Sequence, residues 1–202
     1  MLKPTVWVVA LAMTAAMGQA VAQKDPSNKN EADTAPSVDV INGCRIVPET
    51  NCAGADLRHA SLGNASLRGA NLRGAKLARA DLHHADLRGA DLTDADLESA
   101  RLVATFLQGA TLENANLRGA NLNFARLSAA KMANANLTAA NLEMAWMSKA
   151  QLPNARLVNA NLQEAKLSLA NLENADLTGA RYPYAIFQST FMEGCTACPF
   201  DW

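Results

Sequence analysis

Apolar positions recur with a period of five over most of the chain. From residue 55 to residue 185, every fifth residue is alanine except Thr105. Two places after each of these positions stands a leucine, with four exceptions: Met132, Met147, Tyr182 and Phe187. The other three positions of each pentad are mostly polar residues or glycine. The chain therefore repeats one short unit, and the length of that unit decides the architecture.

A period of five fits neither a long helix nor a continuous strand. A step of five turns the apolar pair by about 140° around a helix, which spreads it over every face. In a strand, an odd step sends the same residue to the opposite face at each repeat. Each pentad must then contain its own corner, made by the polar residues and glycines that follow the leucine. The pattern predicts a solenoid.

The pentads also carry a family resemblance. Ala80-Asp81-Leu82, Ala85-Asp86-Leu87 and Ala120-Asn121-Leu122 resemble the A(D/N)LxX motif of the pentapeptide-repeat family. The resemblance implies an all-β fold, a right-handed quadrilateral β-helix with four pentads in each coil. Leucine and alanine would be stacked inside, and the repeat would make about seven coils.

The composition divides the chain into five segments. Residues 1–22 are predicted to be a secretory signal peptide, because Lys3 precedes an apolar stretch and Ala20-Val21-Ala22 offers a small-residue cleavage site. An uncleaved membrane anchor is the alternative; after cleavage no membrane span is expected. Residues 23–42 are predicted to be a disordered linker. The remaining segments are an N-terminal cap (43–54), the repeat (55–189) and a C-terminal cap (190–202).

The four cysteines form two pairs that flank the repeat. After export to an oxidising compartment we expect disulfides, and a bond between the two ends would have to bridge the whole rod. The predicted pairs are therefore Cys44 with Cys52, and Cys195 with Cys198. The alternative for Cys195-Thr196-Ala197-Cys198 is a redox motif, which would need a thioredoxin-like context. A four-cysteine metal site has less support, because the pairs lie at opposite ends.

The charge balance argues against nucleic-acid recognition. From Ala53 to Trp202 the chain has fourteen Lys or Arg residues and fourteen Asp or Glu residues. A basic groove for nucleic acid is therefore not expected. Some pentapeptide-repeat proteins are gyrase-binding proteins that resemble B-DNA in shape and negative charge. A DNA-mimic, topoisomerase-binding function stays an alternative that the neutral balance disfavours.

Bulky apolar residues at predicted outward positions cluster in the middle of the rod. With four pentads per coil, residues twenty apart lie above one another, so the pattern places several outward residues together. We predict a partner-binding patch here, because aromatic and arginine side chains dominate binding hot spots. The alternatives are scattered surface residues without a function and local cover for departures from the repeat. The predicted patch comprises Phe106, Phe124, Arg126, Met144 and Trp146.

Catalytic, cofactor and metal sites are not predicted. The spacing of Asp81, Asp86, Asp91 and Asp96 sends these carboxylates to four successive faces, where we expect them to form hydrogen bonds to turns. His59, His83 and His84 are few and dispersed, and no nucleophile motif or phosphate-binding glycine loop occurs. We therefore expect an exported, periplasmic or secreted, non-enzymatic protein that acts as a protein-binding or structural scaffold. Redox activity at the C-terminal cysteine pair is the other alternative.

Overall fold

The computed structural model describes residues 39–199. The predicted signal peptide, most of the predicted linker and the last three residues of the predicted C-terminal cap lie outside the described residues. Within residues 39–199, no helix is long and apolar enough to cross a membrane.

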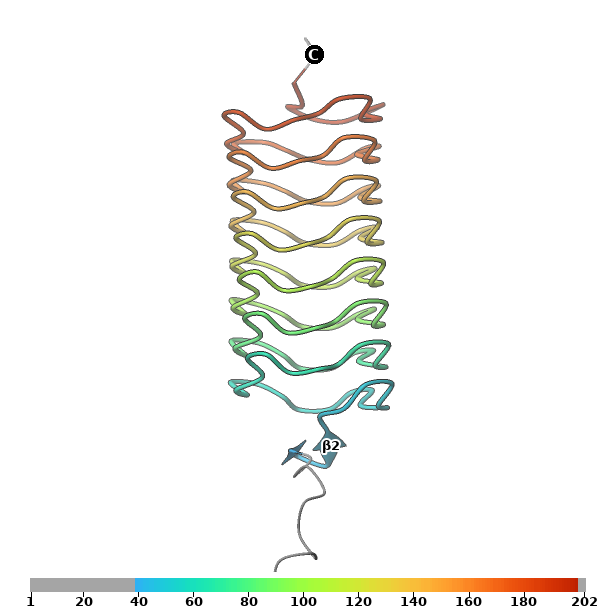
Figure 1. Ribbon diagram of the computed structural model, residues 1–202. Coiled ribbons are helices and arrows are strands. Elements are labelled where there is room, and N and C mark those ends of the chain that lie inside the picture. The colour runs from blue at the N-terminus through green and yellow to red at the C-terminus, as the bar shows by residue number, and fades with distance from the viewer. Residues whose placement is uncertain (1–38, 200–202) are drawn as a thin grey trace, which may run out of the picture. The chain divides into compact units, whose positions relative to one another are not determined.

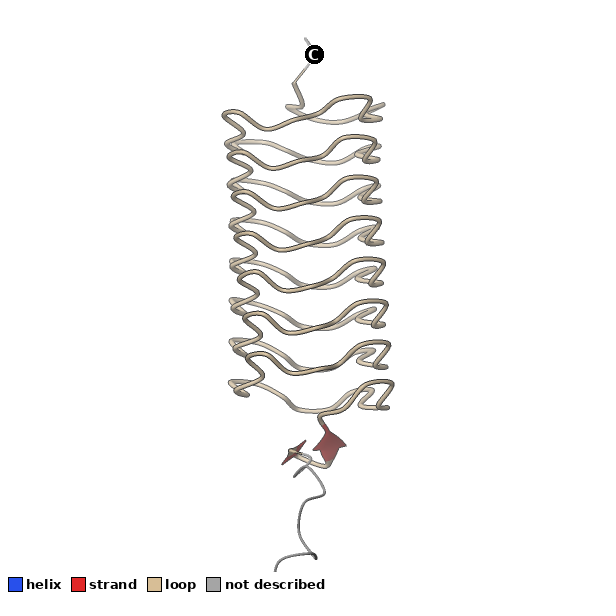
Figure 2. Ribbon diagram, viewed as in Figure 1, coloured by secondary structure: helices blue, strands red, loops and turns tan. Residues whose placement is uncertain are grey.

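Residues 51–196 form a stack of coils, each twenty residues long (Figure 1). In each pentad the residue between alanine and leucine makes a parallel bridge to the residue twenty places later, as Asp56 does to Lys76. The Lys76 amide donates to the Ala55 carbonyl (2.9 Å), and the Leu57 amide donates to the Lys76 carbonyl (2.7 Å). The bridged segments are so short that the coils are drawn as loops in Figure 2. This arrangement confirms the predicted right-handed quadrilateral β-helix.

A tight turn forms each corner of a coil. The amide of each alanine donates to the carbonyl of the leucine three residues before it, as Ala60 does to Leu57 (3.1 Å). The residue before that alanine has a positive φ, for example 59° at His59, whereas the first turn residue does not. This combination defines a type II turn, in which glycine or asparagine is the favoured third residue. The repeat therefore turns once in every pentad.

The core consists of the two inward residues of each pentad. The central leucines and the alanines are almost all fully buried, and Met132 and Met147 replace leucine without becoming exposed. Thr105 takes an alanine position and is also completely buried. Its hydroxyl donates to the carbonyl of Leu82 in the preceding coil (2.8 Å), so the departure from the repeat brings no unpaired hydroxyl into the core.

A small hairpin precedes the first coil. Strand β1 (Val40–Ile41) pairs antiparallel with strand β2 (Cys44–Arg45). The loop residues Asn42 and Gly43 both have positive φ angles, of 49° and 81°, as a type I′ turn requires. The linker predicted over residues 23–42 therefore extended too far, because its last residues belong to this hairpin. The side chain of Asn42 attaches the hairpin to the first coil by donating to the carbonyl of Asp56 (2.7 Å).

Disulfides lie at both ends of the stack. Cys44 is joined to Cys52 with 5.3 Å between their Cα atoms, and Cys195 is joined to Cys198 with 5.8 Å. These are the two pairs that the sequence predicts. The bridge pattern runs from Asn51 to Thr196, so regular coils extend into both segments that were predicted as caps.

Candidate functional site

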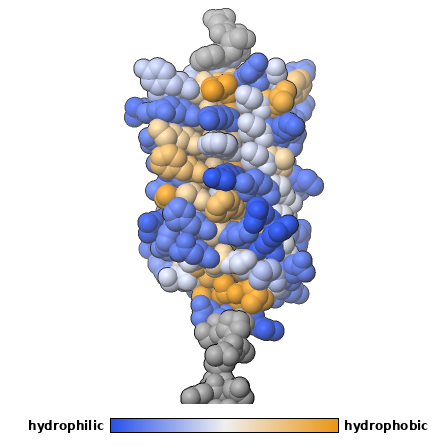
Figure 3. Space-filling view, in the orientation of Figure 1, coloured by the Kyte–Doolittle hydropathy of each residue, from blue (hydrophilic) through white to orange (hydrophobic). Residues whose placement is uncertain are grey.

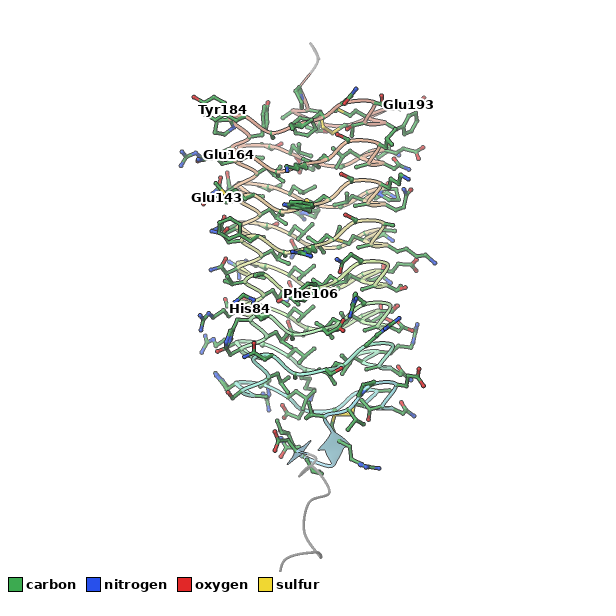
Figure 4. The ribbon with its side chains drawn as sticks, in the orientation of Figure 1. His84, Phe106, Glu143, Glu164, Tyr184 and Glu193 are labelled. Carbon is green, nitrogen blue, oxygen red and sulfur yellow. A yellow bond between two sulfur atoms is a disulfide. The ribbon has the colours of Figure 1, made fainter. Side chains whose placement is uncertain are left out.

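Two neighbouring columns of side chains run along one side of the stack. Parallel β-bridges join one series of residues spaced twenty apart, which we call the outward column: Asp86, Phe106, Arg126, Trp146 and Lys166. The corner column contains the turn residues that lie two positions before them. Figure 4 shows three of its members, His84, Glu164 and Tyr184, at successive heights along one edge of the stack. The two columns bring together all five residues of the predicted patch, which we call the aromatic face: Phe106, Phe124, Arg126, Met144 and Trp146.

Aromatic and cationic side chains alternate along the outward column. The Arg126 guanidinium carbon lies 5.0 Å from the ring centre of Phe106 and 5.9 Å from that of Trp146. On Trp146 the Lys166 ammonium also lies 4.3 Å from the ring centre. Each cation–π contact at an exposed site contributes about 0.5–1 kcal/mol. Together these contacts favour one arrangement of the long side chains.

The cations in and beside this column differ in their ionic partners. At its lower end Arg88 donates two hydrogen bonds to Asp86 (2.8 and 2.6 Å), and this contact lowers the pKa of Asp86. Within residues 39–199, in contrast, neither Arg126 nor Lys166 has a carboxylate within 4.0 Å. The upper part of the column therefore presents cations that no carboxylate neutralises.

The aromatic face encloses a shallow hollow of about 290 Å³. Phe124 and Trp146 are each 49% exposed, whereas Phe106 and Met144 are half-buried. Figure 3 shows apolar side chains gathered on part of the visible surface, among hydrophilic neighbours. The hollow can accept an apolar side chain of a partner. It is lined by His84, Ala104, Phe106, Phe124, Arg126 and Trp146.

Bulky residues in the corner column adopt an unfavourable backbone conformation. Phe124, Met144 and Tyr184 have φ angles of 58°, 55° and 62°. Such left-handed conformations cost a non-glycine residue about 1–2 kcal/mol, and bulky residues are rare there. Another corner of the same coils carries the residues that this conformation favours: Asp94, Asn114, Asn134, Asn154 and Asn174. The turn itself therefore does not explain the bulky side chains of the corner column.

The remaining sequence candidates have structural contacts. Asp81, Asp86, Asp91 and Asp96 lie in successive pentads, and each accepts the amide of the residue two places later, at 3.0–3.2 Å. His83 lies 2.8 Å from Asp81, and its ring contacts His84 edge-on. Within residues 39–199, no three His, Cys, Asp or Glu side chains are placed to hold a metal ion.

The sequence reasoning missed three features of this region. It did not anticipate the contact of Lys166 with Trp146, nor the contributions of His84 and Ala104 to the hollow. The twenty-residue spacing places all three residues in the same two columns, but it does not show which side chains contact one another. A second apolar hollow of about 410 Å³ lies at the C-terminal end and is lined by residues 185–189.

Comparisons with known proteins agree with the repeat and its fold. The sequence model of the family Pentapeptide repeats matches in eight copies, which fall within residues 50–194. No curated protein matches the chain significantly.

HetL from the cyanobacterium Nostoc sp. strain PCC 7120, involved in heterocyst differentiation regulation, is 31% identical over 74% of this chain and 84% of its own, with a TM-score of 0.35. A pentapeptide repeat protein from the Arabidopsis thaliana thylakoid lumen is 28% identical over 55% of this chain and 71% of its own, with a TM-score of 0.33. QnrB1, a plasmid-mediated fluoroquinolone resistance protein, is 17% identical over 77% of this chain and 76% of its own, with a TM-score of 0.48. Since the match of the repeat model covers well over half of the sequence, this chain belongs to the pentapeptide-repeat family.

Proposed function

We propose that this chain is an exported, non-enzymatic pentapeptide-repeat protein that binds another protein through its aromatic face. One observation carries the proposal: two half-exposed aromatic side chains, Phe124 and Trp146, flank a hollow, and cations fix the rings of the outward column. Aromatic and arginine side chains of this kind supply most of the energy in protein interfaces.

The rigidity of the face favours binding. Each residue in the middle of the outward column forms parallel β-bridges with the coils on both sides, as Arg126 does with Phe106 and Trp146. The cation–π contacts already restrain the side chains, so less conformational entropy is lost when a partner docks. Phe124 and Met144 occupy turn positions that asparagine or glycine would fill with less strain, so the repeat itself does not require their bulky side chains.

An extracytoplasmic location, periplasmic or extracellular, belongs to the same proposal. The two disulfides support it, since such bonds persist mainly in oxidising compartments. The predicted signal peptide agrees with this location. The neutral charge balance of the repeat gives no support to a DNA-mimic function, and a redox role for Cys195 and Cys198 has no supporting observation beyond their spacing.

The proposal is tested by affinity capture from the extracytoplasmic fraction of the host. The full chain, expressed with its own N-terminal segment, is compared with the double variant Phe106→Ser and Trp146→Ser. A matched control carries Thr111→Ser and Gln151→Ser, one pentad further along, where Lys131 takes the place of Arg126. We expect a protein retained by the wild type and the control but lost from the Phe106 and Trp146 variant. Equal retention by all three proteins contradicts the proposal.

A further inference from the structure

We propose that the aromatic face binds the same face of a second copy of this chain, with the two rods side by side and antiparallel. This inference rests on the proposed function, because it names the partner that the aromatic face receives. It derives from the order of residues along the outward and corner columns. When each column is placed against an upside-down copy of itself, the side chains that face one another are complementary.

The required symmetry is a two-fold axis perpendicular to both rods, at the level of Phe124 and Arg126. Such an axis inverts height along the rod but keeps each column opposite its own copy. A residue therefore faces the one that lies equally far on the other side of the axis. Every contact away from the axis occurs twice, as in any isologous dimer. Coils follow one another at about 4.8 Å, so the column from residue 84 to residue 164 is about 19 Å high.

Inversion of the corner column pairs complementary side chains. His84 faces Glu164 of the second copy, so an imidazole N–H that can donate a hydrogen bond meets a carboxylate. Ala104 faces Met144, so the small residue that opens the hollow meets a flexible apolar one. Phe124 lies on the axis and faces its own copy. His84 and Phe124 are exposed in the single rod, and Ala104, Met144 and Glu164 are partly exposed, so all are available for contact.

The outward column is complementary in the same register. Phe106 faces Trp146 of the second copy, and Asp86 faces Lys166, which has no carboxylate of its own within 4.0 Å among the described residues. Asp86 already binds Arg88, so this pair adds less than the pair of His84 with Glu164. One unfavourable contact remains, because the two Arg126 guanidinium groups meet near the axis. Each is flanked by Phe106 and Trp146 of its own chain.

A parallel dimer lacks this complementarity. Its axis would run along the rods, so residues of the two copies would meet at equal heights. Lys166 would then lie at the same height as Lys166 of the second copy, and Glu164 at the same height as Glu164 of the second copy. The antiparallel arrangement alone joins the lower half of one face to the upper half of the other. The aromatic face comprises five residues, fewer than the roughly 20–30 per side of a standard interface, so we expect a dissociation constant in the micromolar range or weaker.

A charge exchange between positions 84 and 164 tests the arrangement. The two positions lie four coils, about 19 Å, apart in one rod, so they can interact only between chains. The new residues, glutamate at position 84 and lysine at position 164, suit the left-handed turn conformation there, because Glu49 and Lys149 already adopt it. In sedimentation velocity from about 10 μM to about 1 mM, we expect wild-type dimers and an about tenfold weaker association for His84→Glu or Glu164→Lys alone. The double variant should regain wild-type association.

Cysteine cross-linking supplies an independent readout. Ala104 and Met144 lie about 10 Å apart in one chain, which exceeds the roughly 7 Å limit for a disulfide. The variant Ala104→Cys with Met144→Cys should therefore oxidise to a covalent dimer, whereas Thr111→Cys with Gln151→Cys should not. A wild type that stays monomeric up to about 1 mM, or a double charge variant no better than the single ones, overturns the antiparallel dimer. If the monomeric wild type still captures another protein through Phe106 and Trp146, the proposed function stands without it.

Discussion

Phe124 combines an exposed aromatic ring with a backbone conformation that asparagine prefers. We predict that Phe124→Asn changes the free energy of unfolding by less than about 1 kcal/mol, because relief of the left-handed conformation offsets the lost contacts of a ring that is half-exposed. The same substitution should abolish binding by the aromatic face. Chemical denaturation and sedimentation measure the two effects separately. A loss of stability above about 2 kcal/mol would identify Phe124 as a structural residue instead.

Aspartates at the outward positions make stability depend on pH. Hydrogen bonds from Arg58 lower the pKa of Asp56 to about 2, and those from Thr178 lower the pKa of Asp176. A carboxyl with a lowered folded pKa stabilises the fold above its ordinary pKa near 3.8, and this contribution disappears as the pH falls through the folded value. We predict a thermal midpoint that is nearly constant from pH 7 to about 5 and falls towards pH 2.

The aspartate contribution can be isolated with Asp176→Asn. Asparagine keeps the oxygen that accepts the Thr178 amide (3.0 Å) but does not titrate. The variant should therefore lose less of its thermal midpoint than the wild type between pH 5 and pH 2. Parallel curves for the two proteins would show that other groups cause the pH dependence.

The sequence predicted which residues stack on the aromatic face but not how they contact one another. Phe106, Arg126 and Trp146 could be placed together because the coil is twenty residues long. Their cation–π geometry, and the hollow beside Ala104, depend on side-chain rotamers and on small neighbours, which a periodic pattern does not specify. The left-handed conformation of Phe124 was also hidden, since bulky residues normally avoid it.

At the scale of the pentad, the central leucine is the main source of stability. Leu122 is almost fully buried within the stack of core leucines. We predict that Leu122→Ala lowers the free energy of unfolding by about 2–5 kcal/mol, because it removes apolar contacts and leaves a cavity in a core that relaxes little. Lys131→Ala is the control, since this outward side chain is exposed. Urea denaturation checks both; similar small losses would mean that the coils close around the cavity.

The elements before the repeat were harder to predict than the repeat itself. The coils follow from one rule applied many times, so single departures such as Thr105 do not obscure it. The hairpin of β1 and β2 has two residues in each strand, and no hydrophobic alternation can reveal so short an element. Its one local signal was Asn42-Gly43, the preferred type I′ turn, and the composition of the preceding residues outweighed that signal.

At the scale of the whole molecule, the stack is stabilised mainly between neighbouring coils. Most backbone hydrogen bonds between pentads join residues about twenty apart, so each coil depends on the coils beside it. The two ends have a neighbour on one side only. Local stability should therefore be greatest in the middle coils, and the disulfide of Cys44 with Cys52 should matter most for the first coils.

Removal of this disulfide should loosen one end without unfolding the middle. We predict that Cys44→Ser with Cys52→Ser lowers the opening free energy of the first coils by about 2–3 kcal/mol, because the disulfide closes a short loop. The amides of Leu62 and Leu127 are suitable reporters, since both donate to the next coil at 2.7 Å. Native-state hydrogen exchange should accelerate at Leu62 and stay unchanged at Leu127. Equal acceleration at both would show that the rod opens as one cooperative unit, so that stabilisation of one end extends through every coil.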